Sequence, residues 1–169
     1  MRQNYFIYYL ALVVAQMLIC NYFNLTPYLM LTVLPAAVLC LPTRIGTPLA
    51  MVIAFATGLC VDFLAEGVPG LNTLALVPVA WVRLPLCKFI FGEELVVRGE
   101  DFSIRKHGIG KVTFACVLVQ ALFLLVYIWA DGAAARPFLF LVERFACSLV
   151  AGTALAVAIV DIAKPVDRR

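Results

Sequence analysis

Residues 3–43 read QNYFIYYLALVVAQMLICNYFNLTPYLMLTVLPAAVLCLPT, and these 41 residues include no Asp, Glu, Lys or Arg. A soluble domain does not keep so long an uncharged, apolar segment out of water. A helix needs about 20 apolar residues to cross a hydrocarbon core about 30 Å thick, so the stretch has room for two crossings. The sequence therefore predicts an integral membrane protein that begins with two transmembrane helices.

The composition of the whole chain agrees with this interpretation. Hydrophobic residues make up 64% of the 169 residues and charged residues 14%, whereas ordinary soluble domains have about 45–50% and about 25%. A chain of this length has room for one domain. We therefore expect residues 1–169 to form a single transmembrane domain, an all-α polytopic membrane bundle with almost no soluble part.

Six apolar segments follow one another along the chain, separated by polar or helix-breaking residues. The predicted transmembrane helices cover residues 5–23, 28–41, 48–64, 71–91, 112–130 and 138–162. Pro78 and Pro85 lie inside the fourth helix and are expected to kink it, since neighbouring helices satisfy the backbone groups that prolines free. The sizeable polar segment, residues 92–111, carries charges of both signs and is expected to be a solvated loop.

The distribution of basic residues predicts how the bundle is oriented across the membrane, because Lys and Arg collect in the cytoplasmic loops of membrane proteins. With an inner amino terminus, ten of the 13 basic residues lie in inner segments, one (Arg136) in an outer loop, and two (Arg83 and Arg144) within helices. We therefore predict that both termini and the loop 92–111 are cytoplasmic. Membrane lipids are the expected surroundings; the small net charge of +3 says nothing by itself about nucleic acid, and no such partner is expected.

Charges and small residues recur together inside the predicted helices. Four charged residues fall within these helices, namely Asp62, Arg83, Glu143 and Arg144. Asp62 shares one face of the third helix with Ala50, Ala54 and Gly58, and Arg144 shares one face of the sixth with Ser148, Gly152 and Ala156. Small residues at a spacing of four let helix backbones approach closely in lipid. A charge at the centre of an inserted helix costs roughly 2.5–3.5 kcal/mol, so such residues usually face the bundle and find partners.

Depth along the helices favours an ion pair between Asp62 and Arg144. At 1.5 Å per residue, these residues lie about 6 Å and about 10 Å from the outer turns, whereas Arg83 lies about 20 Å below them. Arg83 is expected instead to reach the inner headgroups, where anionic lipid is available. The pair is either a structural ion pair that fixes helix register or part of a proton or ion relay. The structural interpretation is favoured, because transporters usually carry several intramembrane acids.

No group of reactive side chains is visible in the sequence. The six cysteines lie in apolar segments without a C-x-x-C pair, and His107 is the only histidine, so spacing speaks against metal and redox sites. There is no Walker-type glycine loop and no G-x-S-x-G or H-E-x-x-H string. A lipid-modifying enzyme would carry grouped aspartates or histidines, whereas Asp62 stands alone on its helix. We therefore expect no enzymatic activity, no cofactor and no metal.

Residues 58–74, GLCVDFLAEGVPGLNTL, resemble the G-x-x-x-D-x-x-x-x-x-x-x-G signature of the MreD rod-shape-determining family. Gln16, Asn21, the turn 24–28 and the string Arg83-Leu84-Pro85 are also similar to that family. The specific motifs lie mainly between residues 16 and 85, and the last third of the chain matches only in hydropathy. The residues expected to carry structure or partner binding are Gly58, Asp62, Gly67, Gly70, Arg83, Arg144 and Gly152, of which Arg144 is not carried over from the family.

The resemblance implies a non-enzymatic scaffold subunit of the cell-wall elongation machinery in the bacterial cytoplasmic membrane. Its partner would be the bitopic protein MreC, and together they would link MreB filaments inside to the RodA-type synthase and its transpeptidase outside. The family fold is also similar to the S-components of energy-coupling-factor transporters, which bind vitamins. This similarity supplies the alternative function, a substrate-binding subunit of a vitamin-type transporter, for which Asp62, Asn72, Thr73 and Arg144 could line a polar pocket.

Overall fold

The computed structural model describes residues 5–22, 29–67, 69–92, 108–132 and 137–162. These segments contain six α-helices and one π-helical turn, with no strand among them. In chain order the elements are α1 (Tyr5–Tyr22), α2 (Leu34–Leu39), α3 (Thr47–Val61), the π-helical turn η1 (Asp62–Glu66), α4 (Leu71–Phe91), α7 (Ile109–Gly132) and α8 (Phe138–Ile162). The prediction of an all-α bundle is confirmed.

Four helical segments are long and apolar enough to cross a membrane. They cover Thr47–Ala65, Leu71–Phe91, Ile109–Asp131 and Phe138–Val160, and a shorter apolar helix covers Phe6–Tyr22. By length and composition, the chain is therefore a multi-pass membrane protein. Both prolines of the fourth predicted helix lie inside the continuous helix α4. Most of the predicted polar loop, residues 93–107 with His107, lies outside the described residues.

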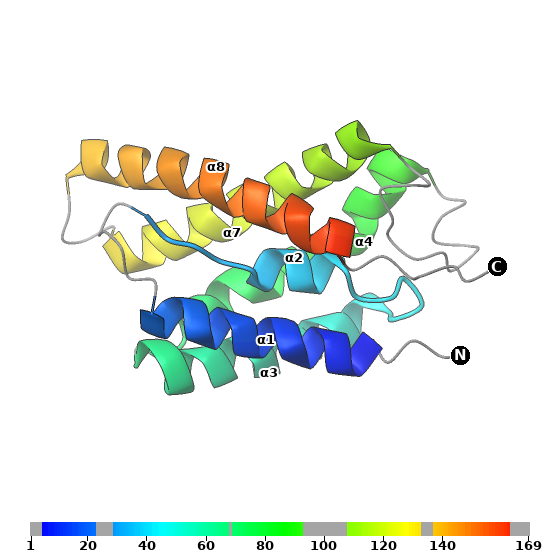
Figure 1. Cartoon of the computed structure of the whole chain (residues 1–169), viewed down its shortest axis with the longest axis horizontal. Coiled ribbons are helices and arrows are strands. Elements are labelled where there is room, and N and C mark those ends of the chain that lie inside the picture. The colour runs from blue at the N-terminus through cyan, green and yellow to red at the C-terminus, as the bar shows by residue number, and fades with distance from the viewer. Residues whose placement is uncertain (1–4, 23–28, 68, 93–107, 133–136, 163–169) are drawn as a thin grey trace.

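The second crossing differs from the helix predicted over residues 28–41. Residues 29–33 have no regular secondary structure, and the helix is confined to the six residues of α2. In Figure 1 this segment runs along the bundle from the end of α1 towards the loop before α3, with α2 in its second half. Extended residues advance about 3.3 Å each, against 1.5 Å in a helix, so a partly extended chain covers the distance with fewer residues.

The core of the bundle surrounds this broken crossing. Every residue from 32 to 39 is buried, and α2 contacts α1, α4, α7 and α8. In Figure 1, α1 and α3 lie on one side of α2, and α7 and α8 lie on the other. A segment buried on all sides must find its hydrogen-bond partners within the protein, because lipid offers none.

The long elements alternate in direction along the chain. Figure 1 shows the start of α1 and the end of α8 at the same end of the bundle, with the loop before α3, the end of α4 and the start of α7. The end of α1, the α3–α4 turn and the start of α8 lie at the opposite end. Such an arrangement is produced by an even number of crossings.

Candidate functional site

The carboxylate of Asp62 is completely buried and accepts five hydrogen bonds from the start of α4. Oδ1 accepts from the backbone N–H and the side-chain amide of Asn72, at 2.9 and 3.0 Å. Oδ2 accepts from the backbone N–H of Gly70 at 2.9 Å, and from the backbone N–H and hydroxyl of Thr73 at 3.2 and 2.8 Å. The first N–H groups of a helix lack intrahelical partners, and the helix dipole favours a negative charge there. The charge of Asp62 is thus compensated within its own helical hairpin.

The turn between α3 and α4 brings these donors to the carboxylate. After α3 the chain widens into η1, and the N–H of Gly67 donates to the backbone carbonyl of Asp62 at 2.8 Å. Gly67 ends η1 with a φ of 70°, and Gly70 is the N-cap of α4 with a φ of 103°. Residues with a side chain rarely adopt such positive φ angles. Gly67 and Gly70 are therefore both required by the backbone of the turn.

Gly58 lies one helical turn before Asp62 on the same face of α3. A Cβ at Gly58 would lie 2.5 Å from the Cα of Thr73 and 2.7 Å from its backbone nitrogen. Since real Cβ atoms do not approach backbone so closely, the two helices reach this separation only with glycine at position 58. Thr73 therefore packs on Gly58 and donates to Asp62, and the G-x-x-x-D motif joins α3 to α4 over two successive turns.

The predicted ion pair between Asp62 and Arg144 is wrong. Nη1 of Arg144 donates instead to Oδ2 of Asp131, in a 2.5 Å salt bridge between the start of α8 and the end of α7. These two side chains are 13% and 29% exposed. Depth along the helices compares charged side chains only, whereas the partners of Asp62 include the backbone amides that begin α4.

Arg83 is buried inside the bundle, so the expectation that it reaches the inner headgroups is also wrong. Its side chain is 1% exposed, and Nη2 donates to the carbonyl oxygens of Leu41 at 2.6 Å and Pro42 at 2.7 Å. Nε and Nη1 have no hydrogen-bond partner in the described part of the chain. Carbonyl dipoles at the end of the second crossing thus hold this cation, which ties α4 to the loop before α3.

Side chains from α1 and α8 satisfy part of the backbone of the non-helical segment 29–33. Gln16 is fully buried, accepts from the N–H of Val33 at 2.6 Å and donates to the carbonyl of Leu31 at 3.4 Å. The hydroxyl of Ser148 accepts from the N–H of Met30 at 2.9 Å. Sequence analysis named Gln16 only through the resemblance and Ser148 only as a small residue, although a polar side chain in the middle of an apolar helix was the available signal.

Gly152 lies on the buried face of α8, against α7. A Cβ at this position would collide with the side-chain amide of Gln120. Gln120 is fully buried, and neither its Nε2 nor its Oε1 has a hydrogen-bond partner within the described residues. Sequence analysis passed over Gln120, which is likewise a polar residue in the middle of a long apolar helix. Its amide has hydrogen-bonding capacity that the described structure does not use.

The geometry of these residues is that of a structural network. The oxygens of Asp62 are occupied by donors of α4, and Arg144 is held by Asp131. No three His, Cys, Asp or Glu side chains come together as a metal site among the residues the structure describes. In comparisons with family models, curated proteins and solved structures, nothing matches the chain. The residues and their contacts therefore carry the functional argument.

Proposed function

We propose that the chain is a non-enzymatic membrane scaffold subunit of the MreD type, which binds an MreC-like single-span protein and supports cell-wall elongation and cell shape. The observation that carries the proposal is the contact between α3 and α4. Gly58, Asp62, Gly67 and Gly70, on which the resemblance rests, each hold this contact or its turn. A motif used for internal packing suits a protein that acts through the outer faces of its helices.

The same contacts weigh against a polar pocket lined by the four residues that the transporter function required. Asp62 is bonded to Asn72 and Thr73, while Arg144 is bonded to Asp131. A ligand at this place would displace buried hydrogen bonds, each of which costs roughly 1–3 kcal/mol if one partner is left without another. The network is therefore better suited to fixing the hairpin than to binding and releasing a substrate.

The proposal places the protein in the bacterial cytoplasmic membrane with both termini in the cytoplasm. Ten of the 13 basic residues support this direction, and the start of α1 and the end of α8 lie at one end of the bundle (Figure 1). Further partners in the proposed complex are a RodA-type synthase with its transpeptidase outside and MreB filaments inside.

Co-purification tests the scaffold function directly. The tagged chain is extracted in mild detergent from cells of its own organism, and the proteins that remain bound are identified. We expect an MreC-like single-span protein, and we expect depletion of the chain to change cell shape. Recovery of ATPase subunits, or of a tightly bound vitamin, would reject the scaffold in favour of the transporter subunit.

The transporter subunit stays the second candidate because of one observation. A broken transmembrane segment is typical of transporters, where the unwound part lies at the substrate site, and residues 29–33 are non-helical, with Thr32 and Val33 buried in the core. The test is a screen of vitamins for an increase in the unfolding temperature of the purified protein. An increase that the variant Gln120→Leu loses would support a substrate site beside the unused amide.

A further inference from the structure

We propose that the outward face of α8 is the docking site for a transmembrane helix of a partner protein, with a basic side chain of that helix opposite Glu143. We define the outward face as the exposed residues Glu143, Ala146, Cys147, Val150, Ala154 and Ala158. They recur at intervals of three and four and so share one side of the helix. The inference deepens the proposed function, on which it rests for the identity of the partner.

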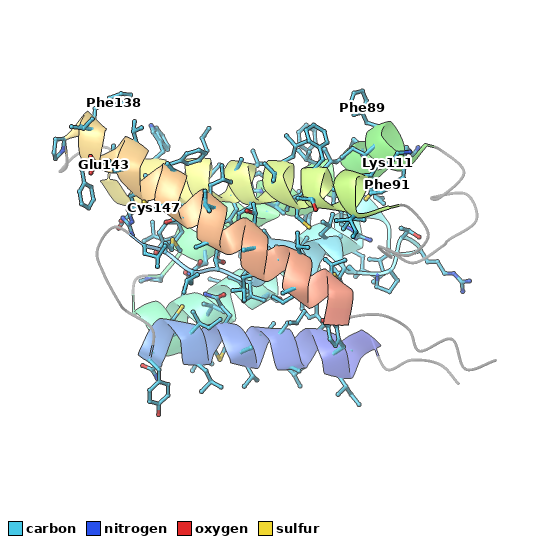
Figure 2. All side chains as sticks on the ribbon, turned by 45° about the horizontal axis from the view of Figure 1, so that its top comes forward. Phe89, Phe91, Lys111, Phe138, Glu143 and Cys147 are labelled. Carbon is cyan, nitrogen blue, oxygen red and sulfur yellow. The ribbon has the colours of Figure 1, made fainter. Side chains whose placement is uncertain are left out.

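The helix α8 is covered by the rest of the bundle on one narrow side only. In the apolar stretch of α8, 11% of the residues are buried inside the bundle, against 50% in the corresponding stretch of α7. The buried side carries Ser148, Gly152 and Ala156, which pack inward. In Figure 2, α8 crosses the surface of the bundle, and Phe138, Glu143 and Cys147 lie on its first half. A partner can therefore reach most of the length of α8.

Glu143 is a charged residue on this otherwise apolar surface, and no described residue of its own chain compensates its charge. The neighbouring Arg144 turns away to Asp131, and the structure records no ion pair or hydrogen bond for Glu143 within the described residues. Glu143 lies five residues after Phe138, about 8 Å along the helix, beside the exposed apolar side chains of Val142 and Val150. Charges within a span are costly and are found paired. Because no described residue of this chain pairs with Glu143, the proposal places the cation on another molecule.

The shape of the face indicates that this cation belongs to a helix. Ala146, Cys147, Ala154 and Ala158 are small, and small residues allow the backbone of a second helix to come close. The face extends from Glu143 to Ala158, about 23 Å at 1.5 Å per residue, which is most of a hydrocarbon core about 30 Å thick. A long, smooth face with one charge near its end fits a transmembrane helix whose basic residue lies at the matching depth.

A second copy of this chain does not supply the cation. In a symmetric dimer formed through this face, the Glu143 side chains of the two copies would lie close together, and like charges repel. Within the described part of α8 the basic side chain is Arg144, which Asp131 already holds. The occupant is therefore a different protein with a Lys or Arg in its transmembrane helix.

Native cysteines provide a matched crosslinking experiment. Cys147 is exposed on the outward face of α8, and Cys60 is exposed on α3. Two variants each keep one of these residues and carry alanine at the other, while single cysteines are placed along the transmembrane helix of the co-expressed single-span partner. After mild oxidation in native membranes, we expect Cys147 to form disulfides with partner positions three or four residues apart, and Cys60 to form none.

Charge exchange tests the role of Glu143 in the same complex. We expect Glu143→Lys to lower recovery of the partner roughly tenfold, since breaking a desolvated charge pair weakens binding. Changing the facing basic residue of the partner to Glu should restore recovery. The unfolding temperature of the isolated Glu143→Lys protein should stay unchanged, because Glu143 makes no ion pair or hydrogen bond with the described residues of its own chain. The variant Ala56→Leu, on the exposed face of α3, should bind normally, whereas Ala154→Leu should not.

The outcomes separate this inference from the proposed function. If the wild-type chain recovers its single-span partner, but neither Glu143→Lys nor Ala154→Leu affects recovery, the docking face is wrong and the scaffold function stands. Crosslinks from Cys60 alone would show that the partner binds to α3 instead. Disulfides between the Cys147 residues of two copies would show that this face forms a dimer and does not bind a different protein. Recovery of no partner by the wild-type chain would overturn both proposals.

Discussion

At the residue scale, the Asp62 carboxylate offers a direct test of the α3–α4 contact. Asp62→Asn keeps the size of the side chain but replaces one acceptor oxygen with a donor. At least two buried donors of α4 then lose their acceptor, whichever oxygen is replaced. Because each such loss costs roughly 1–3 kcal/mol, we expect the free energy of unfolding to fall by about 3 kcal/mol. Equilibrium unfolding in mixed detergent micelles measures it.

The matched control is the same exchange at Asp131. Its salt bridge with Arg144 is partly exposed, and pairs of this kind contribute roughly 0–1 kcal/mol. Asp131→Asn should therefore be much less destabilising than Asp62→Asn. Equal effects of the two variants would show that the five hydrogen bonds of Asp62 are not what holds the hairpin.

The substitution of glutamine by leucine should affect stability differently at the two buried positions Gln16 and Gln120. Gln16→Leu removes the partner of two backbone groups in the extended segment, so we expect it to lower the free energy of unfolding by about 2 kcal/mol. Gln120→Leu removes an amide that has no partner in the described residues, so we expect it to leave stability unchanged or to raise it. Thermal unfolding of the two variants side by side provides the measurement.

The result for Gln120 also bears on function. If Gln120→Leu is as stable as the wild-type protein but impairs growth or cell shape, the amide has a partner outside the chain. If it destabilises the isolated protein as much as Gln16→Leu does, the amide is satisfied within the bundle, and the prediction is wrong.

At the scale of helices, three glycines differ in how closely a neighbouring part of the chain approaches them. A Cβ at Gly58 meets the backbone of Thr73, one at Gly152 meets the flexible end of Gln120, and one at Gly110 meets nothing within 4 Å. We expect Gly58→Ala to cost about 2–3 kcal/mol, since backbone cannot move aside as a side chain can. Gly152→Ala should cost about 1 kcal/mol. Gly110→Ala should be neutral or stabilising by about 0.5 kcal/mol, because alanine favours the helix.

The order of these three effects matters more than their size. The quantity to compare is the shift in the unfolding midpoint for each alanine variant under one set of detergent conditions. A larger loss at Gly152 than at Gly58 would make the α7–α8 contact, rather than the α3–α4 contact, the tightest in the bundle.

The long helices could be predicted from the sequence because length and hydropathy are enough to define a crossing. The broken second crossing could not, since residues 28–41 are equally apolar whether extended or helical. Pro35 in the first turn of α2 was the one local sign, because proline is tolerated at the start of a helix and restricts the residue before it. The side chains that support the extended part come from α1 and α8, and such distant pairing is not encoded by local pattern.

Spacing in the sequence identified some residues of the network but not their contacts, and it did not identify Gln120 or Asp131. Burial of Gly58, Asp62 and Gly152 follows from their spacing on small-residue faces. The partner of Asp62 does not follow, because backbone amides at the start of a helix look the same in every sequence. Arg83 was misplaced for a related reason, since the carbonyl groups that hold it also belong to the backbone. Charged side chains in this bundle find backbone partners that a search for opposite charges overlooks.

At the scale of the whole molecule, the charged side chains Asp62, Arg83 and Arg144 each have a partner within the bundle, whereas the charge of Glu143 on its surface is left open: it has no ion pair or hydrogen bond among the described residues. Asp62 is held by amides, Arg83 by carbonyls and Arg144 by Asp131. The inner network fixes the shape of the bundle, and the open charge lies on the face where a partner can reach it. This division suits a scaffold, whose interior is fixed and whose exterior binds.

The orientation of the whole bundle can be tested with two new cysteines at its opposite ends. Pro69 is exposed in the turn between α3 and α4, and Gly110 is exposed at the start of α7. The variants Pro69→Cys and Gly110→Cys are both made in a protein whose Cys60 and Cys147 are changed to alanine. The loop before α3, the end of α4 and the start of α7 lie at the end that holds Gly110, and Arg44, Lys88 and Lys111 belong to these segments, so that end should face the cytoplasm. A membrane-impermeant maleimide should label Pro69→Cys in intact cells and Gly110→Cys only after permeabilisation. The reverse pattern would invert the bundle and place Glu143 near the cytoplasmic surface, so that the partner would need its basic residue at that depth instead.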